Sequence, residues 1–193
     1  LHNMNIHVVR WATQGFADII AAEGEEGKAR GVAVCMDCRN HSMEFARAAA
    51  EVCAANGIHV RIFESLRPTP ELSFAVREYH CQAGINVTAS HNPKEYNGYK
   101  VYWQDGAQLP PHHADAIAKR LGEIDIFSDI RTMDYDEAVK AGLIEVLGAE
   151  TDEKFLGNVM GQVNDKATVE KVADSFKMVY TPFHGTGHKL IPE

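Results

Sequence analysis

The chain has 193 residues, of which 45% are hydrophobic and 24% are charged, so it can bury a core and does not have the composition of a disordered chain. Its formal net charge of −8 argues against a nucleic-acid partner, because binding to the phosphate backbone needs clustered Lys and Arg. The apolar runs are too short to span a bilayer, and no secretory signal opens the sequence. We therefore expect a globular cytoplasmic protein with no membrane partner.

The first half of the chain alternates helical and strand-like segments. Residues 5–22 place apolar side chains at helical spacing, ahead of a polar stretch at residues 23–30. Strand-like runs follow at residues 31–36, 58–63 and 84–88, with helical patterns between them at residues 42–56 and 70–81. Strands that alternate with helices in this way predict an α/β fold, a mainly parallel sheet with helices on both faces.

The pattern changes after residue 88. The runs at residues 98–103 and 107–109 flank Asp105 and Gly106, which are typical of a hairpin turn. A helix is predicted at residues 111–121.

Strand signals fade from about residue 124 to residue 151, where acidic, helix-prone sequence dominates. We interpret residues 1–124 as a first domain, residues 125–150 as a junction and residues 151–193 as the start of a second α/β domain. That start contains one strand-like run, at residues 176–180, and one strand cannot form a sheet. We therefore expect the second domain to be incomplete, and the opening Leu1-His2-Asn3 suggests that upstream sequence is also missing.

A polar loop follows the strand predicted at residues 84–88 and contains Ser90. Ligands of open parallel sheets bind beyond the carboxyl ends of the strands, where Ser90 would lie. A serine hydroxyl is a weak nucleophile that needs a base or electrostatic help, and His91, Lys94 and Lys100 are basic residues close by. Taken alone, residues 90–93 are better explained as a turn in which Ser and Asn cap backbone amides and Pro fixes the bend.

A longer stretch changes this interpretation. TASHNP at residues 88–93, followed by YNGYK at residues 96–100, resembles the phosphoserine signature of the α-D-phosphohexomutases, the phosphoglucomutase/phosphomannomutase family. The resemblance extends to MNI at residues 4–6, DCR at residues 37–39, RPTP at residues 67–70 and YTPFHGTG at residues 180–187. Members of that family have four domains. The resemblance therefore implies the first domain and the beginning of the second, without the family's metal loop and sugar-recognition loop.

The resemblance implies an intramolecular phosphotransferase. Ser90 would carry a phosphoryl group, give it to a hexose phosphate and take the other phosphoryl group from the resulting hexose 1,6-bisphosphate, so that hexose 1-phosphate and hexose 6-phosphate interconvert. A phosphoserine carries about −1.5 to −2 charges at neutral pH. The implied cofactor is Mg²⁺, held through the Ser90 phosphate with its remaining ligands outside this chain.

Other residues of the implied site follow from the same resemblance. Lys100 matches the family's basic residue ten positions after the serine and is expected to stabilise charge and handle protons, although its usual pKa of about 10.4 would have to fall for it to act as a base. His91 and Asn92 are expected to orient the phosphate by hydrogen bonds. Asp37 and Arg39 follow the first strand and either shape the phosphate site or form an ion pair that fixes a loop.

The sequence leaves the substrate open. The segment after Lys100 favours glucose phosphate, with ribose phosphate as the second candidate and mannose phosphate as a further one within the family. A noncatalytic module that binds phosphosugars is the alternative from another class. We expect this chain alone to be inactive and to self-associate through apolar surface around Val179 and Tyr180.

Overall fold

The computed structural model describes residues 4–193; Leu1 to Asn3, with which the predicted first domain begins, lie outside the described residues. The described chain is built around a five-stranded sheet with the strand order β4-β3-β1-β2-β5. The strands are β1 (Val32–Met36), β2 (Val60–Phe63), β3 (Ala83–Val87), β4 (Tyr99–Trp103) and β5 (Ile144–Leu147). All neighbouring strands run parallel except β4, which is antiparallel to β3. This confirms the predicted mainly parallel α/β sheet.

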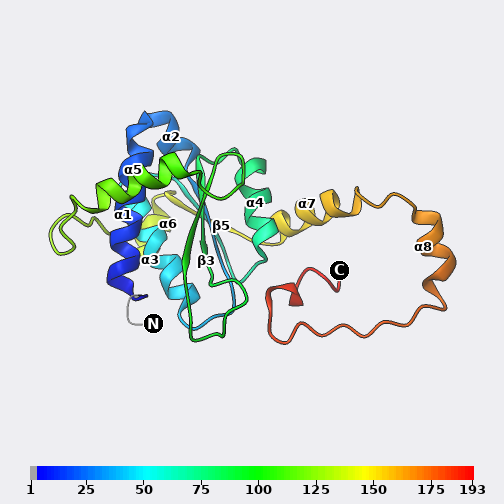
Figure 1. Ribbon diagram of the computed structural model, residues 1–193. Coiled ribbons are helices and arrows are strands. Elements are labelled where there is room, and N and C mark those ends of the chain that lie inside the picture. Colours follow the sequence, from blue (N-terminus) through cyan, green and yellow to red (C-terminus); the bar gives the residue numbers. More distant parts are fainter. Residues whose placement is uncertain (1–3) are drawn as a thin grey trace.

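Helices cover both faces of the sheet (Figure 1). One face carries α1 (Ile6–Ala22), α3 (Ser42–Ala55), α5 (Pro111–Leu121) and α6 (Tyr135–Lys140). The other face carries α4 (Thr69–Glu78), against which α7 (Ala149–Met160) packs. Within residues 4–193, no helix is both long enough and apolar enough to cross a membrane.

Local sequence explains where the main elements begin and how closely they pack. The Asn5 side chain accepts hydrogen bonds from the backbone amides of His7 and Val8 and so caps the start of α1. Every residue of β1 is buried, as expected for a central parallel strand. Gly31, which precedes β1, has a φ of +71°, and a Cβ atom there would lie 2.0 Å from the His59 carbonyl oxygen. Only glycine fits this close approach between two strand starts.

Two predicted segments differ in detail from the structure. The polar stretch at residues 23–30 contains a helix of its own, α2 (Gly24–Arg30). The hairpin after β4 forms through the predicted turn, but its second arm makes a single bridge, between Tyr102 and Gln108, and no strand.

The predicted junction at residues 125–150 was wrong in one respect, because it contains a strand of the main sheet. The strand β5 pairs in parallel with β2, and α6 packs against α3. As an edge strand, β5 is buried only at its first and last residues, Ile144 and Leu147. It therefore lacks the continuous apolar run of a central strand, and the sheet extends to residue 147 rather than ending before residue 124.

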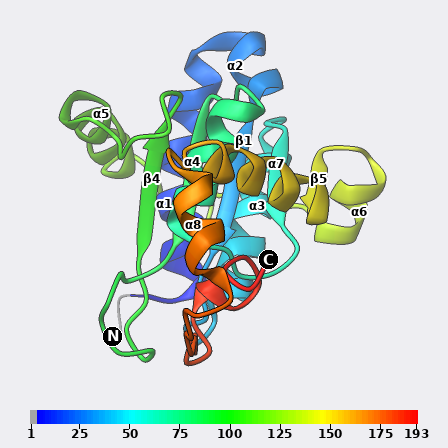
Figure 2. The same cartoon turned by 90° about the vertical axis from the view of Figure 1, so that its right-hand side faces the viewer.

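The C-terminal part leaves the sheet. The helix α8 (Lys166–Ala173) has no buried residue and projects away from the body of the protein (Figures 1 and 2). The strand predicted at residues 176–180 does not form, because no described strand lies beside it to pair with its backbone. Val179 is 96% exposed and Tyr180 40% exposed. The chain then returns through a short 3₁₀ helix (Thr186–His188), and Leu190 is buried.

A buried ion-pair network joins α4, α7 and this returning segment. The Arg67 guanidinium donates to both carboxylate oxygens of Asp152, at 2.7 and 3.0 Å. Lys189 Nζ lies 2.6 Å from a carboxylate oxygen of Glu64, which also contacts Arg67. Glu71 lies beside the pair with no exposed surface, its nearer oxygen 3.8 Å from Arg67 Nε. Within the described residues, neither Glu71 oxygen has a hydrogen-bond partner of ordinary geometry.

Burial, reinforced by the neighbouring Asp152 carboxylate, raises the pKa of Glu71 from 4.5 to about 8. The folded protein therefore binds this proton more tightly than the unfolded chain, and the stability that Glu71 contributes is lost as the pH rises from 4.5 through about 8. Glu71→Gln keeps a neutral side chain, so we expect its free energy of unfolding to fall less than that of the parent chain over this range. Urea denaturation at a series of pH values measures this, with Glu153→Gln on the exposed part of α7 as the control. Equal pH slopes in the parent and Glu71→Gln would contradict the assignment.

Candidate functional site

The polar loop begins at the carboxyl end of β3, as predicted. Ser90 is exposed and has a left-handed backbone, with a φ of +63°, which is uncommon for a residue other than glycine. Its backbone amide donates to Thr88 Oγ1 at 3.1 Å. The loop therefore presents the Ser90 side chain to solvent on a turn that surrounding hydrogen bonds have to hold.

The Asp37 carboxylate, at the carboxyl end of β1, anchors the base of this loop. One oxygen accepts hydrogen bonds from the Arg39 amide and from Ser42 Oγ, each at 3.0 Å. The other accepts from Arg39 Nε at 2.8 Å and from Thr88 Oγ1 at 2.6 Å. Since Thr88 Oγ1 in turn accepts from the Ser90 amide, two hydrogen bonds link the end of β1 to the serine.

Arg39 holds the remainder of the loop through backbone carbonyl groups. Its two terminal nitrogens donate to the carbonyl oxygens of Ser90, Asn92, Pro93 and Tyr96. Its side chain is only 7% exposed, so water competes little for these donors. The Asp37 and Arg39 pair thus fixes a loop, which is one of the two roles expected from the sequence.

The far end of the loop is also fixed. The Asn97 side-chain amide donates to the Asn40 carbonyl at 3.0 Å and to Ser42 Oγ at 2.9 Å. A Cβ atom on Gly98 would lie 2.7 Å from the Thr88 carbonyl oxygen, so glycine is needed where the chain enters β4. Both ends of the Ser90 loop are therefore attached to the segment that follows β1.

Ser90 lines a cavity of about 430 Å³ at this edge of the sheet. The walls come from the ends of β1, β2 and β3 and from Gly185 and Thr186 of the returning C-terminal segment. The charged residues in the lining are Asp37, Arg39 and Arg67, two guanidinium groups against one carboxylate. Counting the lining residues alone, the formal charge is +1 in a chain whose net charge is −8. Arg67 is also paired with Asp152, which lies outside the lining, so the site favours an anion through the donors of its two guanidinium groups more than through a free positive charge.

The residues predicted from the sequence are only partly brought together. Ser90, His91, Asp37 and Arg39 line the cavity, and Ser90 Oγ lies 3.4 Å from His91 Nδ1. Asn92 and Lys100 are not among the lining residues. Lys100 is half-buried in β4, in register with Asn86 of β3. Because directly opposed residues of antiparallel strands project from the same face, Lys100 lies on the face from which Asn86 enters the cavity.

Sequence reasoning did not single out Arg67, Thr69, Asn86 and Thr88 as site residues. Asn86 is a polar residue in an otherwise apolar strand, is 1% exposed, and donates to Thr69 Oγ1 at 2.9 Å. Its Oδ1 has no hydrogen-bond partner within the described residues. Arg67 and Thr69 follow the carboxyl end of β2. Ligands of open parallel sheets bind beyond the carboxyl ends of strands, so the argument that identified Ser90 could also have identified these two residues.

The described residues offer little to a metal ion. No group of three or more His, Cys, Asp or Glu side chains within residues 4–193 is arranged to hold one. Both oxygens of Asp37, the carboxylate in the cavity lining, already accept hydrogen bonds. Cys35 is buried in β1, and burial raises its thiol pKa to about 12, while Cys38 is exposed.

Comparison with known proteins gives a consistent result. The family model for phosphoglucomutase/phosphomannomutase, alpha/beta/alpha domain I, matches residues 1–126. Phosphoglucomutase of Staphylococcus saprophyticus is 33% identical over 191 residues, which is 98% of this chain and 33% of the relative. Phosphomannomutase of Mycoplasma pneumoniae is 32% identical over 99% of this chain and 34% of its own length. Human phosphopentomutase is 30% identical over 99% of this chain and 32% of its own length.

A solved structure shows the same fold. The open form of pp63/parafusin, a phosphoglucomutase from Paramecium, superposes with a TM-score of 0.68 at 21% identity, over 93% of this chain and 36% of that structure. The present chain therefore spans about a third of the length of these relatives. Since the domain I model covers well over half of its residues, the chain belongs to the phosphoglucomutase/phosphomannomutase family.

Proposed function

We propose that the protein to which this chain belongs is a phosphohexomutase in which Ser90 carries the transferred phosphoryl group. The observation that carries the proposal is the exposed Ser90 hydroxyl, held at the carboxyl end of β3 in a cavity lined by the guanidinium groups of Arg39 and Arg67. Relatives named phosphoglucomutase, phosphomannomutase and phosphopentomutase support the same class of reaction.

The proposed reaction has two transfers. In the first, the bond between Ser90 Oγ and phosphorus breaks while a hydroxyl oxygen of the hexose phosphate binds the phosphorus, and the proton of that hydroxyl passes through a base to Ser90 Oγ. This leaves a hexose 1,6-bisphosphate. In the second, Ser90 Oγ attacks the other phosphorus of the bisphosphate, the serine proton passes to the departing sugar oxygen, and the phosphoserine is restored. Hexose 1-phosphate and hexose 6-phosphate are thereby interconverted.

The proposed roles of the basic residues follow from their positions. His91 lies within reach of Ser90 Oγ, at 3.4 Å, and is proposed to orient the phosphoryl group, with Asn92 hydrogen-bonding it from the adjacent loop position. Lys100 is proposed to stabilise charge and handle protons from the sheet face that it shares with Asn86. Asp37 and Arg39 are proposed to act indirectly, by holding the loop that contains Ser90. Their side-chain hydrogen bonds go to each other, to this loop and to Ser42.

The proposed cofactor is Mg²⁺, which offsets the charge of the phosphoryl group when bound. A phosphate on Ser90 would supply one ligand. The described residues show no carboxylate cluster for the others, so we place them outside this chain.

Glucose phosphate is the first substrate that we propose, with ribose phosphate and mannose phosphate as the other candidates.

The chain alone is proposed to be inactive, because phosphoryl transfer relies on positioned charges that these residues do not complete. Exposed Phe176, Met178 and Val179 offer apolar surface through which the isolated chain would self-associate. A noncatalytic module that binds phosphosugars is the other candidate, because the cavity lined by Arg39 and Arg67 would serve to bind a phosphate without transferring it.

Substitutions in the whole protein separate the mutase from the noncatalytic module. Ser90→Ala removes the oxygen that carries the phosphoryl group, so turnover of glucose 1-phosphate with Mg²⁺ and glucose 1,6-bisphosphate should fall by about 10⁴-fold or more. Lys100→Ala should slow turnover by about 10²–10³-fold while Ser90 still becomes phosphorylated. A coupled dehydrogenase assay of glucose 6-phosphate measures both, with Ser128→Ala as the control. Unchanged turnover in Ser90→Ala would contradict the mechanism, and an inactive parent protein that binds the sugar phosphate would favour the noncatalytic module.

A further prediction concerns the support of the Ser90 loop in the 193-residue chain. Arg39→Ala removes the donors to four loop carbonyl groups, so the loop should open more often and trypsin should cut after Lys94 at least about tenfold faster. Arg47→Ala, which removes a guanidinium stacked at 4.9 Å on the Tyr135 ring at another site, is the control. Circular dichroism checks that both variants stay folded. Equal cleavage of the Lys94 site in the two variants would show that Arg39 does not hold the loop.

A further inference from the structure

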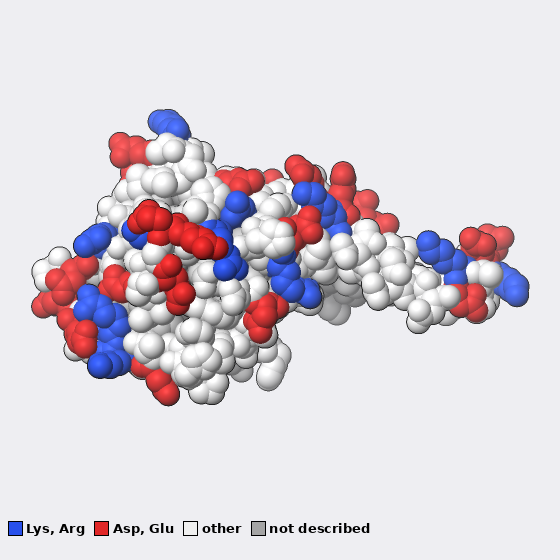
Figure 3. All heavy atoms as spheres, turned by 90° about the horizontal axis from the view of Figure 1, so that it is seen from above, with Lys and Arg blue, Asp and Glu red and all other residues white. Residues whose placement is uncertain are grey.

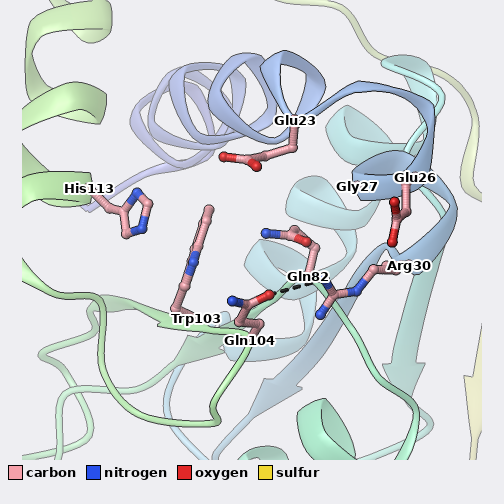
Figure 4. Close-up of a pocket in the computed structure, with 8 residues that line it drawn as sticks. All are labelled: Glu23, Glu26, Gly27, Arg30, Gln82, Trp103, Gln104 and His113. Atoms are coloured by element: carbon pink, nitrogen blue, oxygen red, sulfur yellow. Dashed lines mark hydrogen bonds between the residues drawn. The ribbon is translucent and has the colours of Figure 1, made fainter.

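A second cavity, of about 340 Å³, lies at the opposite end of the sheet from Ser90. Its walls come from the end of α1, from α2, from the residue before β3, from the end of β4 and from the first turn of α5 (Figure 4). No step of the proposed mutase reaction uses these residues. The volume is enough for a small molecule.

Gln82 is the most deeply buried polar side chain in this cavity. The residue is 5% exposed, and Figure 4 shows its amide pointing into the space between Glu23 and Gln104. Within the described residues, no hydrogen bond to the Gln82 side chain is formed. The Gln82 amide atoms are not among the polar atoms cut off from solvent, so water in the cavity can reach them. The cavity therefore offers one donor and one acceptor that a polar ligand can take over from water.

The cavity also has carboxylates without partners. Glu23 and Glu26 lie on its rim and form no ion pair or side-chain hydrogen bond within residues 4–193. Arg30, the cation of the lining, is already engaged. Its three guanidinium nitrogens donate to the carbonyl oxygens of His80 and Cys81 and to Gln104 Oε1, the last of which is drawn as a dashed line in Figure 4.

The aromatic wall does not offset this negative charge. The His113 ring packs on Trp103 with a centroid distance of 4.1 Å, and Trp103 is buried. Burial, followed by the neighbouring His112, lowers the pKa of His113, which disfavours a positive charge on this imidazole. Two carboxylates and one guanidinium leave the lining with a formal charge of −1. The surrounding face, seen in Figure 3, carries both signs of charge and a contiguous group of acidic side chains.

We propose that this cavity binds a small organic cation with N–H donors, a guanidinium or primary ammonium compound. Its charge lies against Glu23, while Glu26 lies farther along the rim beside Arg30 (Figure 4), and one N–H group donates to the Gln82 side-chain carbonyl. The negative lining repels sugar phosphates, so this site and the Ser90 cavity select ligands of opposite charge.

The test is a titration of the ¹⁵N-labelled 193-residue chain with n-butylguanidinium and n-butylammonium, with butyrate as the anion of similar shape. We expect saturable shifts of the Gln82 side-chain amide and Trp103 indole N–H resonances with at least one cation, with a Kd on the order of 1 mM, and none with butyrate. Shifts with butyrate as large as those with the cations, or no saturable shift with either cation, would overturn the proposal.

Substitutions at Glu23, between α1 and α2, and within α2 locate the binding of the cation. The double variant Glu23→Gln, Glu26→Gln should weaken binding of the cation at least about tenfold, since it removes both carboxylates of the cavity lining. Glu25→Gln should leave binding unchanged, because Glu25 pairs with Lys28 at 2.8 Å and does not line the cavity. Equal affinity in the double variant and the control would place the cation elsewhere and refute the site.

Discussion

The ion pair between Asp37 and Arg39 is the interaction on which the candidate active site depends. Asp37 accepts from Thr88 at the start of the Ser90 loop, and Arg39 donates to four carbonyl groups along it. Both residues follow β1, the central strand of the sheet. The pair is largely buried, so water competes little for its hydrogen bonds. These bonds therefore hold the backbone of the loop although the loop's own side chains are exposed. The left-handed serine is thus held in one conformation, which an exposed turn would not retain alone.

The two ends of the sheet differ in the charge that they present. The carboxyl ends of β1, β2 and β3 gather Arg39 and Arg67 around an exposed hydroxyl, whereas the opposite end gathers Glu23 and Glu26 around a buried amide. The net charge of −8 does not indicate that basic and acidic side chains gather at opposite ends of the sheet. Local charge is set by which side chains the topology brings to each end, so an acidic protein can still provide a site for a phosphate.

Much of the fold could be predicted from the sequence, because buried strands and amphipathic helices have a clear periodicity. The central strands and α5 lie within a residue or two of their predicted bounds. The strand β5 was missed because an edge strand buried at only two positions carries little pattern. The prediction of a strand at residues 176–180 was wrong although the apolar pattern is present. Its apolar residues have no neighbouring strand to pair with among the described residues.

Site residues that are neighbours in the sequence could be predicted, whereas site residues that come together only in the folded structure could not. Ser90 and His91 are neighbours in the sequence, and a resemblance could identify them. Arg67 and Asn86 reach the same cavity from separate strands, and no local pattern marks them together. The role of Arg39 likewise depends on carbonyl groups more than fifty residues away in the chain, which only the folded structure brings within reach.

The most direct test of this account is to locate the phosphoryl group itself. The whole protein is incubated with Mg²⁺ and glucose 1,6-bisphosphate whose phosphoryl groups carry ¹⁸O, and its peptides are then examined by mass spectrometry. The account predicts one phosphorylated position, Ser90, whose labelled phosphoryl group is replaced by an unlabelled one when unlabelled glucose 1-phosphate is added in excess. A phosphoryl group on another residue, or a label on Ser90 that excess substrate does not replace, would contradict it.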